Sequence, residues 1–136
     1  MGQNDNGTMK KYKVQYKKRK LFTWIELSRD GRSAPFRFLI DTGAQCTVMS
    51  EKAAFELMFD VDNIKKRDTI ISANGEPTLA GKVRLPLFEA FGWKEKNFEV
   101  YVLELMPGFS GVIGNDFLEK FKKFRIYYDT QEVEVG

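Results

Sequence analysis

Residues 36–44 read Phe36-Arg37-Phe38-Leu39-Ile40-Asp41-Thr42-Gly43-Ala44, so an apolar run ends in an aspartate and a turn that contains glycine. A second apolar run, Val112-Ile113, ends in Gly114. The two runs predict two strands, of which the first delivers a carboxylate into a turn and the second supports that turn. This arrangement is half of a hydrolytic site built from two carboxylates. The chain contains one Asp-Thr-Gly, so the other half must come from a second copy of the chain.

The composition indicates one soluble globular domain. The chain has 136 residues, of which 43% are hydrophobic and twelve are Phe, enough to bury a single core. No apolar run approaches the roughly eighteen residues of a membrane span, and the first residues lack the apolar segment of a signal peptide. We therefore expect no membrane partner for this stretch of chain and a cytoplasmic location.

The residues that the chain lacks exclude several reaction classes. It has no His, which excludes Ser-His and Cys-His nucleophilic systems and the common zinc sites that contain His. We expect neither a metal nor another cofactor. The single cysteine, Cys46, cannot form an intrachain disulfide. A buried apolar role is favoured for it over a free thiol near the site, because free cysteines are usually buried and inert.

A polar leader with a basic arm occupies residues 1–20, ahead of a predicted domain over residues 21–136. Seven basic residues and no acid lie between Lys10 and Lys20. Residues 11–17 alternate in polarity, which suits a half-exposed strand, and Tyr12 and Tyr16 offer rings on which bases could stack. A solvated strand face or a flexible arm is favoured over nucleic-acid binding, since basic runs are a weak signal.

The remaining patterns predict a mainly β chain with one or two short helices. Residues 21–27 and 34–40 suggest a hairpin, Ser50 caps a helix over residues 51–58, and Asn74-Gly75 joins strands at 69–72 and 79–87. Residues 92–96 form a turn between strands at 85–91 and 97–105. Asp116 is predicted to cap a helix over residues 117–122, and short strands at 126–128 and 133–135 end the chain.

The residue types around Asp41 suit acid–base hydrolysis of a peptide bond. Two carboxyl groups held close together cannot both ionise easily, so one acts as base while its protonated partner acts as acid. Thr42 offers a hydroxyl that can lock the turn, Gly43 permits close approach of backbone or ligand, and Ala44 leaves room for substrate. Taken alone, the tripeptide is better explained as a simple β-turn, since all three residues favour turns.

The wider sequence resembles the retropepsin-like aspartic proteases, the single-domain relatives of pepsin. Residues 38–50 look like their active-site signature, and residues 111–118 resemble their second signature, an apolar pair and a glycine followed by a helix. The Asn74-Gly75 hairpin lies between the signatures, where that family carries its flap, and residues 126–135 resemble its final strands. The resemblance implies an all-β fold, a closed acid-protease barrel with one Asp-Thr-Gly lobe per chain.

The same resemblance implies a role for each site residue. Asp41 would be the catalytic carboxylate, paired with Asp41 of a second copy in a homodimer that cleaves a polypeptide substrate. The active-site loop would be supported by Thr42, Gly43, Ala44, Ile113 and Gly114. A flap over residues 72–80 would cover the substrate, and the substrate-binding residues would be Gln45, Cys46, Ser72, Ala73, Asn74, Gly75 and Glu76.

Two positions depart from the retroviral members of that family. Gln45 and Cys46 stand where retroviral enzymes often carry acidic residues, and residues 45–50 look closer to the retroelement and cellular members. Two alternatives to an endopeptidase stay open. One is a dimer of the same fold that binds peptides without cutting them, and the other is a nucleic-acid-associated module that uses the basic arm.

Overall fold

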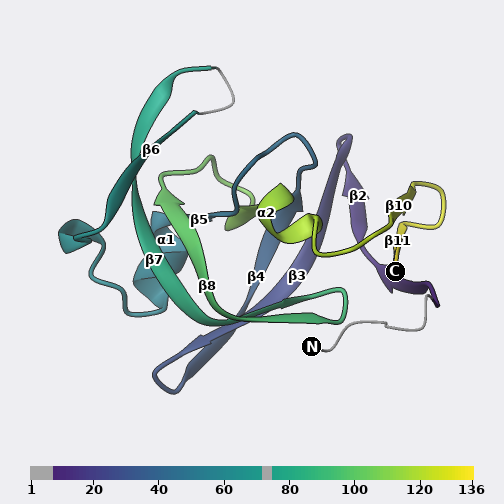
Figure 1. Cartoon of the computed structure of the whole chain (residues 1–136), viewed down its shortest axis with the longest axis horizontal. Helices are drawn as coiled ribbons and strands as arrows, with labels where there is room; N and C mark the ends of the chain where they lie inside the picture. The colour runs from purple at the N-terminus through teal and green to yellow at the C-terminus, as the bar shows by residue number, and fades with distance from the viewer. Residues whose placement is uncertain (1–7, 72–74) are drawn as a thin grey trace.

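The computed structural model describes residues 8–71 and 75–136, and strands make up most of them (Figure 1). The predicted mainly β fold with two short helices is therefore confirmed. In chain order the elements are β1 (Lys10–Lys13), β2 (Gln15–Lys17), β3 (Lys20–Arg29), β4 (Arg32–Ile40), β5 (Val48–Ser50), α1 (Glu51–Glu56), the 3-10 turn η1 (Val61–Asn63), β6 (Arg67–Ile71), β7 (Pro77–Ala90), β8 (Trp93–Leu103), β9 (Gly111–Ile113), α2 (Asn115–Leu118), β10 (Phe124–Tyr127) and β11 (Glu132–Val135).

The larger sheet has the strand order β2-β3-β4-β9-β5-β8-β7-β6. Strand β9 lies between β4 and β5, parallel to β4 and antiparallel to β5. The sheet is open, because no ladder joins β2 to β6 within the described residues. The strands of the expected barrel are thus present, but the closure is not. Strand β2 is only three residues long, and β6 pairs with β7 alone and extends away from the rest of the sheet (Figure 1).

Two-residue turns close the two long hairpins. Asp30 and Gly31, with φ of 50° and 81°, join β3 to β4, so the predicted hairpin is present, but its strands continue beyond the predicted ends to Arg29 and Arg32. The predicted turn over residues 92–96 is wrong in extent, because Phe91 and Gly92 alone make the turn and Ala90 already pairs with Trp93. Positive φ at both turn residues matches the right-handed twist of the flanking strands, which lets β7 and β8 stay paired up to the turn.

The helix at residue 51 starts as the sequence predicts but ends earlier. The Ser50 hydroxyl accepts a hydrogen bond from the Ala53 N–H at 3.0 Å, which is the expected N-cap. Helix α1 ends at Glu56, and Met58 has a φ of 68° and an exposed side chain. Met58 therefore does not continue the buried helix face that Ala54 and Leu57 share.

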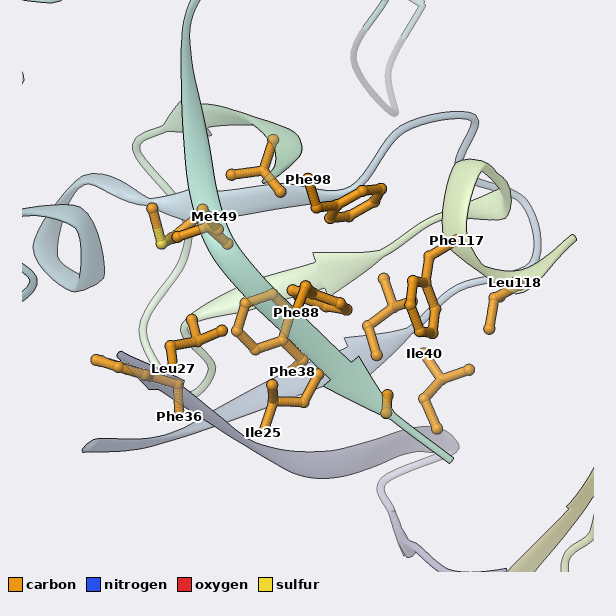
Figure 2. Packing of buried hydrophobic residues seen from close by; sticks show 14 of the residues in the cluster. Ile25, Leu27, Phe36, Phe38, Ile40, Met49, Phe88, Phe98, Phe117 and Leu118 are labelled. Carbon is orange, nitrogen blue, oxygen red and sulfur yellow. The ribbon is translucent and has the colours of Figure 1, made fainter. Parts of the chain in front are cut away.

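Aromatic rings from four elements form the centre of the core (Figure 2). Phe88 of β7 is fully buried, and its ring centroid lies 5.8 Å from Phe38 of β4, 5.1 Å from Phe98 of β8 and 5.0 Å from Phe117 of α2. Such tilted and edge-to-face pairs stabilise a core beyond their buried area. This cluster fixes α2 against the sheet directly behind the end of β4.

The basic arm is folded into both sheets. Strand β1 pairs with β11 in a three-stranded sheet that also holds β10, and β2 pairs with β3. Tyr12 packs edge-on against Phe91, and the Lys13 ammonium lies 3.5 Å from the Glu132 carboxylate. Residues 11–17 are thus extended as predicted, but they form two strands that separate at Val14 and join different sheets. The division of the chain at residue 20 stays a prediction.

Candidate active site

Asp41 lies directly after the last residue of β4, with its backbone held by β9. Its N–H donates to the Ile113 carbonyl at 3.1 Å, which extends the parallel pairing of β4 and β9 by one step. The half-buried Asp41 side chain accepts a hydrogen bond at Oδ1 from the Gly43 N–H at 2.9 Å. A Cβ at Gly43 would lie 3.2 Å from the same oxygen, so a larger residue there would press on the carboxylate. The turn therefore fixes one carboxylate oxygen of Asp41.

The start of α2 holds the loop that follows Asp41. The Asn115 N–H donates to the Ala44 carbonyl at 2.8 Å, and the Asp116 N–H donates to the Gln45 carbonyl at 3.1 Å. The Asn115 side-chain amide donates to the Thr42 carbonyl at 2.8 Å. The first N–H groups of a helix have no partner within the helix. Here they bind the Asp41 loop, which gives both segments their missing hydrogen bonds.

A buried threonine joins the loop to α2 and β9. Thr47 is fully buried, and its hydroxyl donates to Asp116 Oδ1 at 2.6 Å while accepting from the Gly114 N–H at 3.1 Å. The Thr47 N–H donates to the other Asp116 oxygen at 3.0 Å. Asp116 is therefore not the predicted helix cap: α2 begins at Asn115 with Gly114 as N-cap, and ends at Leu118. The carboxylate is used instead to hold residue 47.

Gly114 allows this close approach of β9 to the loop. A Cβ at Gly114 would lie 2.5 Å from the carbonyl carbon and oxygen of Cys46, which no side chain tolerates without a backbone shift. Ile113 is fully buried just before it. The structure thus places Asp41, Ala44, Ile113 and Gly114 close together. Thr47, Asn115 and Asp116 were not predicted to support the loop, although a polar pair directly after a buried strand and glycine was a signal for it.

The other predicted site residues are spread over the loop and the β6–β7 hairpin. Thr42, Gly43 and Gln45 are exposed, and Ala44 and Cys46 are half-buried. Gly75 and Glu76 are exposed just before β7, whereas Ser72, Ala73 and Asn74 lie outside the described residues. Burial and the Asp116 carboxylate raise the pKa of the Cys46 thiol, while the Lys82 ammonium lowers it. Cys46 thus stays a protonated thiol at neutral pH, and it is less buried than the sequence suggested.

A family model described as aspartyl protease matches residues 25–117, a stretch that contains both Asp41 and its supports on β9 and α2. The chain belongs to the aspartyl protease family. It is 31% identical over 97 residues to an uncharacterized protein of Rickettsia prowazekii (strain Madrid E), a match that covers 68% of this chain and 39% of that protein. The chain therefore spans about two fifths of that relative.

The fold of this aspartyl protease is similar to that of a solved relative. A crystal structure of a retropepsin-like aspartic protease from Rickettsia conorii matches with a TM-score of 0.68 and 23% identity. The match covers 94% of this chain and 91% of that one. The comparison confirms the retropepsin-like fold that the two signatures predict.

Neither a metal centre nor a membrane-spanning helix is found in the described part of this aspartyl protease. Residues 8–71 and 75–136 contain no group of three or more Cys, Asp or Glu side chains placed to hold a metal ion. None of the helices in those ranges is long and apolar enough to cross a membrane.

Proposed function

We propose that the chain is an aspartic endopeptidase whose active site joins two Asp41 carboxylates from two copies of the chain. One observation carries this proposal: a single Asp41 lies at the end of a buried strand, in an exposed turn whose backbone is held from behind by β9 and α2. The family match supports protease activity in general. The homodimer follows from the chemistry, because one chain supplies one carboxylate in this setting.

In the proposed mechanism the two carboxylates share one proton. Like charges held close together do not both ionise readily, so one Asp41 removes a proton from water while the other protonates the amide. Two aspartates that share a proton in this way are the general pattern of aspartic proteases. The Gly43 N–H donates a hydrogen bond to Oδ1 of Asp41, and the second carboxylate oxygen accepts no hydrogen bond from the described residues. That oxygen would face the water and the second carboxylate.

The exposed residues of the loop are proposed to meet the partner and the substrate. Thr42 and Gly43 lie at the exposed tip, where a two-fold axis would place them opposite their own copies. An extended peptide would bind by backbone hydrogen bonds with alternate side chains in pockets. The β6–β7 hairpin, which projects beyond the sheet edge, would cover that peptide (Figure 1).

Replacement of Asp41 by Asn tests the catalytic role. The variant keeps the size of the side chain and an oxygen for the Gly43 N–H, so we expect a folded protein that cleaves no peptide. Cleavage by the wild type is measured on a peptide library across acid and neutral pH. Retained peptidase activity in a pure preparation of the Asn variant would contradict the catalytic role of Asp41. A wild type that binds peptides but cuts none would instead favour the non-catalytic dimer.

A mixing experiment tests whether two chains share the site. Wild-type protein and an excess of the Asp41→Asn variant are unfolded and refolded together, so that mixed dimers form. Each mixed dimer holds one Asp41, and activity per wild-type chain should fall with the fraction of variant. A site contained in one chain would keep its activity unchanged. Molar mass by light scattering shows whether the dimer exists at the assay concentration.

We also propose a reducing compartment such as the cytoplasm as the location of the active chain. Cys46 has no intrachain disulfide partner, and its raised pKa makes it slow to react. Cell fractionation with an antibody against the chain is the direct measurement. Recovery of the chain in an oxidising compartment contradicts this location but leaves the catalytic proposal intact.

A further inference from the structure

A row of side chains crosses five strands of the large sheet on the same face as Asp41. Cross-strand partners connect Leu39 of β4, Val112 of β9, Val48 of β5, Tyr101 of β8 and Lys82 of β7. Partners in adjacent strands project to the same face, and residues two apart along a strand do as well. Leu39 precedes Asp41 by two residues. The row therefore starts beside the catalytic carboxylate and ends on the strand that carries the β6–β7 hairpin.

The chemistry of this row changes along its length. The three side chains nearest Asp41 are apolar, and the last two are an aromatic hydroxyl and an ammonium group. Adjacent strands lie about 4.8 Å apart, so Tyr101 is roughly 14 Å and the Lys82 backbone roughly 19 Å from Leu39 along the row. The Lys82 ammonium lies 5.3 Å from the centre of the Tyr101 ring, so its charge is close to the roughly 14 Å position. An extended peptide rises about 3.3 Å per residue, so about four residues span that distance. A peptide lying across the sheet would thus meet an apolar surface near the scissile bond and a polar one further out.

The polar end of the row is part of an ion cluster with a net positive charge. The cluster is defined by three cations and two carboxylates, namely Lys66, Lys82, Arg84, Asp68 and Glu99. Glu99 makes its shortest ion pair with Lys66 at 2.9 Å. The Lys82 ammonium lies 3.5 Å from Glu99 and 3.7 Å from Asp68, and both distances exceed those of a strong charge-assisted hydrogen bond. Lys82 can therefore turn toward a further carboxylate.

The cluster is electrostatically connected to the active-site loop. Burial and the Asp116 carboxylate raise the pKa of the Cys46 thiol, whereas the Lys82 ammonium lowers it. The charge of Lys82 therefore acts on the loop that carries Asp41. The Tyr101 hydroxyl donates to Asp68 Oδ2 at 3.3 Å, which ties β8 to the outer strand β6. The Lys82 ammonium lies 5.3 Å from the centre of the Tyr101 ring. Lys82 and Tyr101 thus form one wall between the loop and the root of the β6–β7 hairpin.

We infer that Lys82, supported by Tyr101, selects substrates that carry an acidic side chain three or four residues from the scissile bond. The inference rests on the proposed endopeptidase function, because it places the peptide across the Asp41 face of the sheet. Near the bond itself, Leu39, Val112 and Val48 select an apolar side chain. A two-fold dimer repeats this row, so the preference applies on both sides of the scissile bond.

The test compares peptides that differ only at the outer position. Peptides with Glu, Gln or Lys at the third or fourth residue from an apolar cleavage site are cleaved by the wild type, and kcat/KM is measured at low and high salt. We expect about a three- to tenfold preference for Glu over Gln at low salt, since partly exposed ion pairs are weak and screened. Lys82→Met should reduce that preference to less than about twofold.

Two further variants separate a lost contact from a damaged fold. Lys82→Arg keeps the positive charge and should keep the preference for Glu. Lys94→Met makes the same charge change on an exposed residue beside the β7–β8 turn, far along β8 from Tyr101, and should leave the preference unchanged. Equal loss of the preference in Lys82→Met and Lys94→Met would mean that overall charge, and not a local contact, sets it, and would overturn the inference.

Binding measurements distinguish failure of this inference from failure of the catalytic proposal. The Asp41→Asn variant is titrated with labelled Glu and Gln peptides, and fluorescence anisotropy gives the ratio of the two Kd values. If the wild type cleaves both peptides equally well, the inference is wrong and the catalytic proposal stands. If no chain cleaves but the Asn variant binds the Glu peptide more tightly, the selectivity stands and the catalytic proposal falls.

Discussion

Replacing Thr47 by Val tests whether the hydrogen bonds behind Asp41 stabilise the whole fold. The substitution keeps the shape of the side chain but removes the hydroxyl, which donates to Asp116 at 2.6 Å and accepts from Gly114 at 3.1 Å. A hydrogen bond to a charged group contributes about 1.5–3 kcal/mol, and a buried N–H left unsatisfied costs about 1–3 kcal/mol. Because Asp116 is only partly buried, the lower halves of these ranges apply. The free energy of unfolding should fall by about 3 kcal/mol.

Urea unfolding in the Asp41→Asn background measures this loss without self-cleavage. With an m value of about 2 kcal/mol/M, a loss of 3 kcal/mol lowers the urea midpoint by about 1.5 M. Protein concentration is held constant, because a dimer would make the midpoint depend on it. Thr69→Val is the matched control: Thr69 is exposed on β6, and its change should stay within about 0.5 kcal/mol. If both variants unfold at the same urea concentration, the Thr47 network does not hold the loop.

Three other substitutions test the packing and the charges around the site. Gly114→Ala places a Cβ 2.5 Å from the Cys46 backbone. The loss in kcat/KM, expressed as a free energy, should exceed the loss in the free energy of unfolding measured in urea. Phe88→Ala removes a fully buried ring and should lower the free energy of unfolding by about 3–5 kcal/mol, with no loss contradicting the aromatic core. The hydrogen bond from Lys66 lowers the pKa of Glu99 to about 2, so its stabilising effect is complete above pH 4.5 and is lost as the pH falls toward 2. The difference in stability between wild type and Glu99→Gln should therefore shrink over that pH range, and a constant difference would refute the assigned ion pairs.

Features set by neighbouring residues were predicted well from the sequence. The Ser50 cap of α1 and the hairpin of β3 and β4 each depend on residues close together in the sequence, and both are present. The strand before Asp41 followed from apolar residues in sequence. The extent of the β7–β8 turn was misjudged, because a polar run such as residues 94–96 occurs equally well in a loop and on the exposed face of a strand.

Features set by distant residues were not predictable in the same way. The insertion of β9 between β4 and β5 depends on pairing with segments far away in the sequence, and hydrophobic periodicity carries no information about such pairing. The expected closure of the barrel came from the family resemblance, whereas the described sheet ends in open edges at β2 and β6. The row of side chains from Leu39 to Lys82 can likewise be recognised only when the register of the five strands is known.

Asp116 shows why local rules failed at the site itself. A helix cap contributes about 1 kcal/mol, and the sequence offered Asp116 for that role at the start of a helix. In the fold the same carboxylate accepts two hydrogen bonds from Thr47, at 2.6 and 3.0 Å, and bonds to a charged group contribute more than a cap. The long-range contacts therefore outweigh the cap, and α2 begins two residues earlier than predicted, with Gly114 as its N-cap. An Asp-Thr-Gly turn without partners like Thr47 and Asp116 would lack this support, so the tripeptide alone does not define such a site.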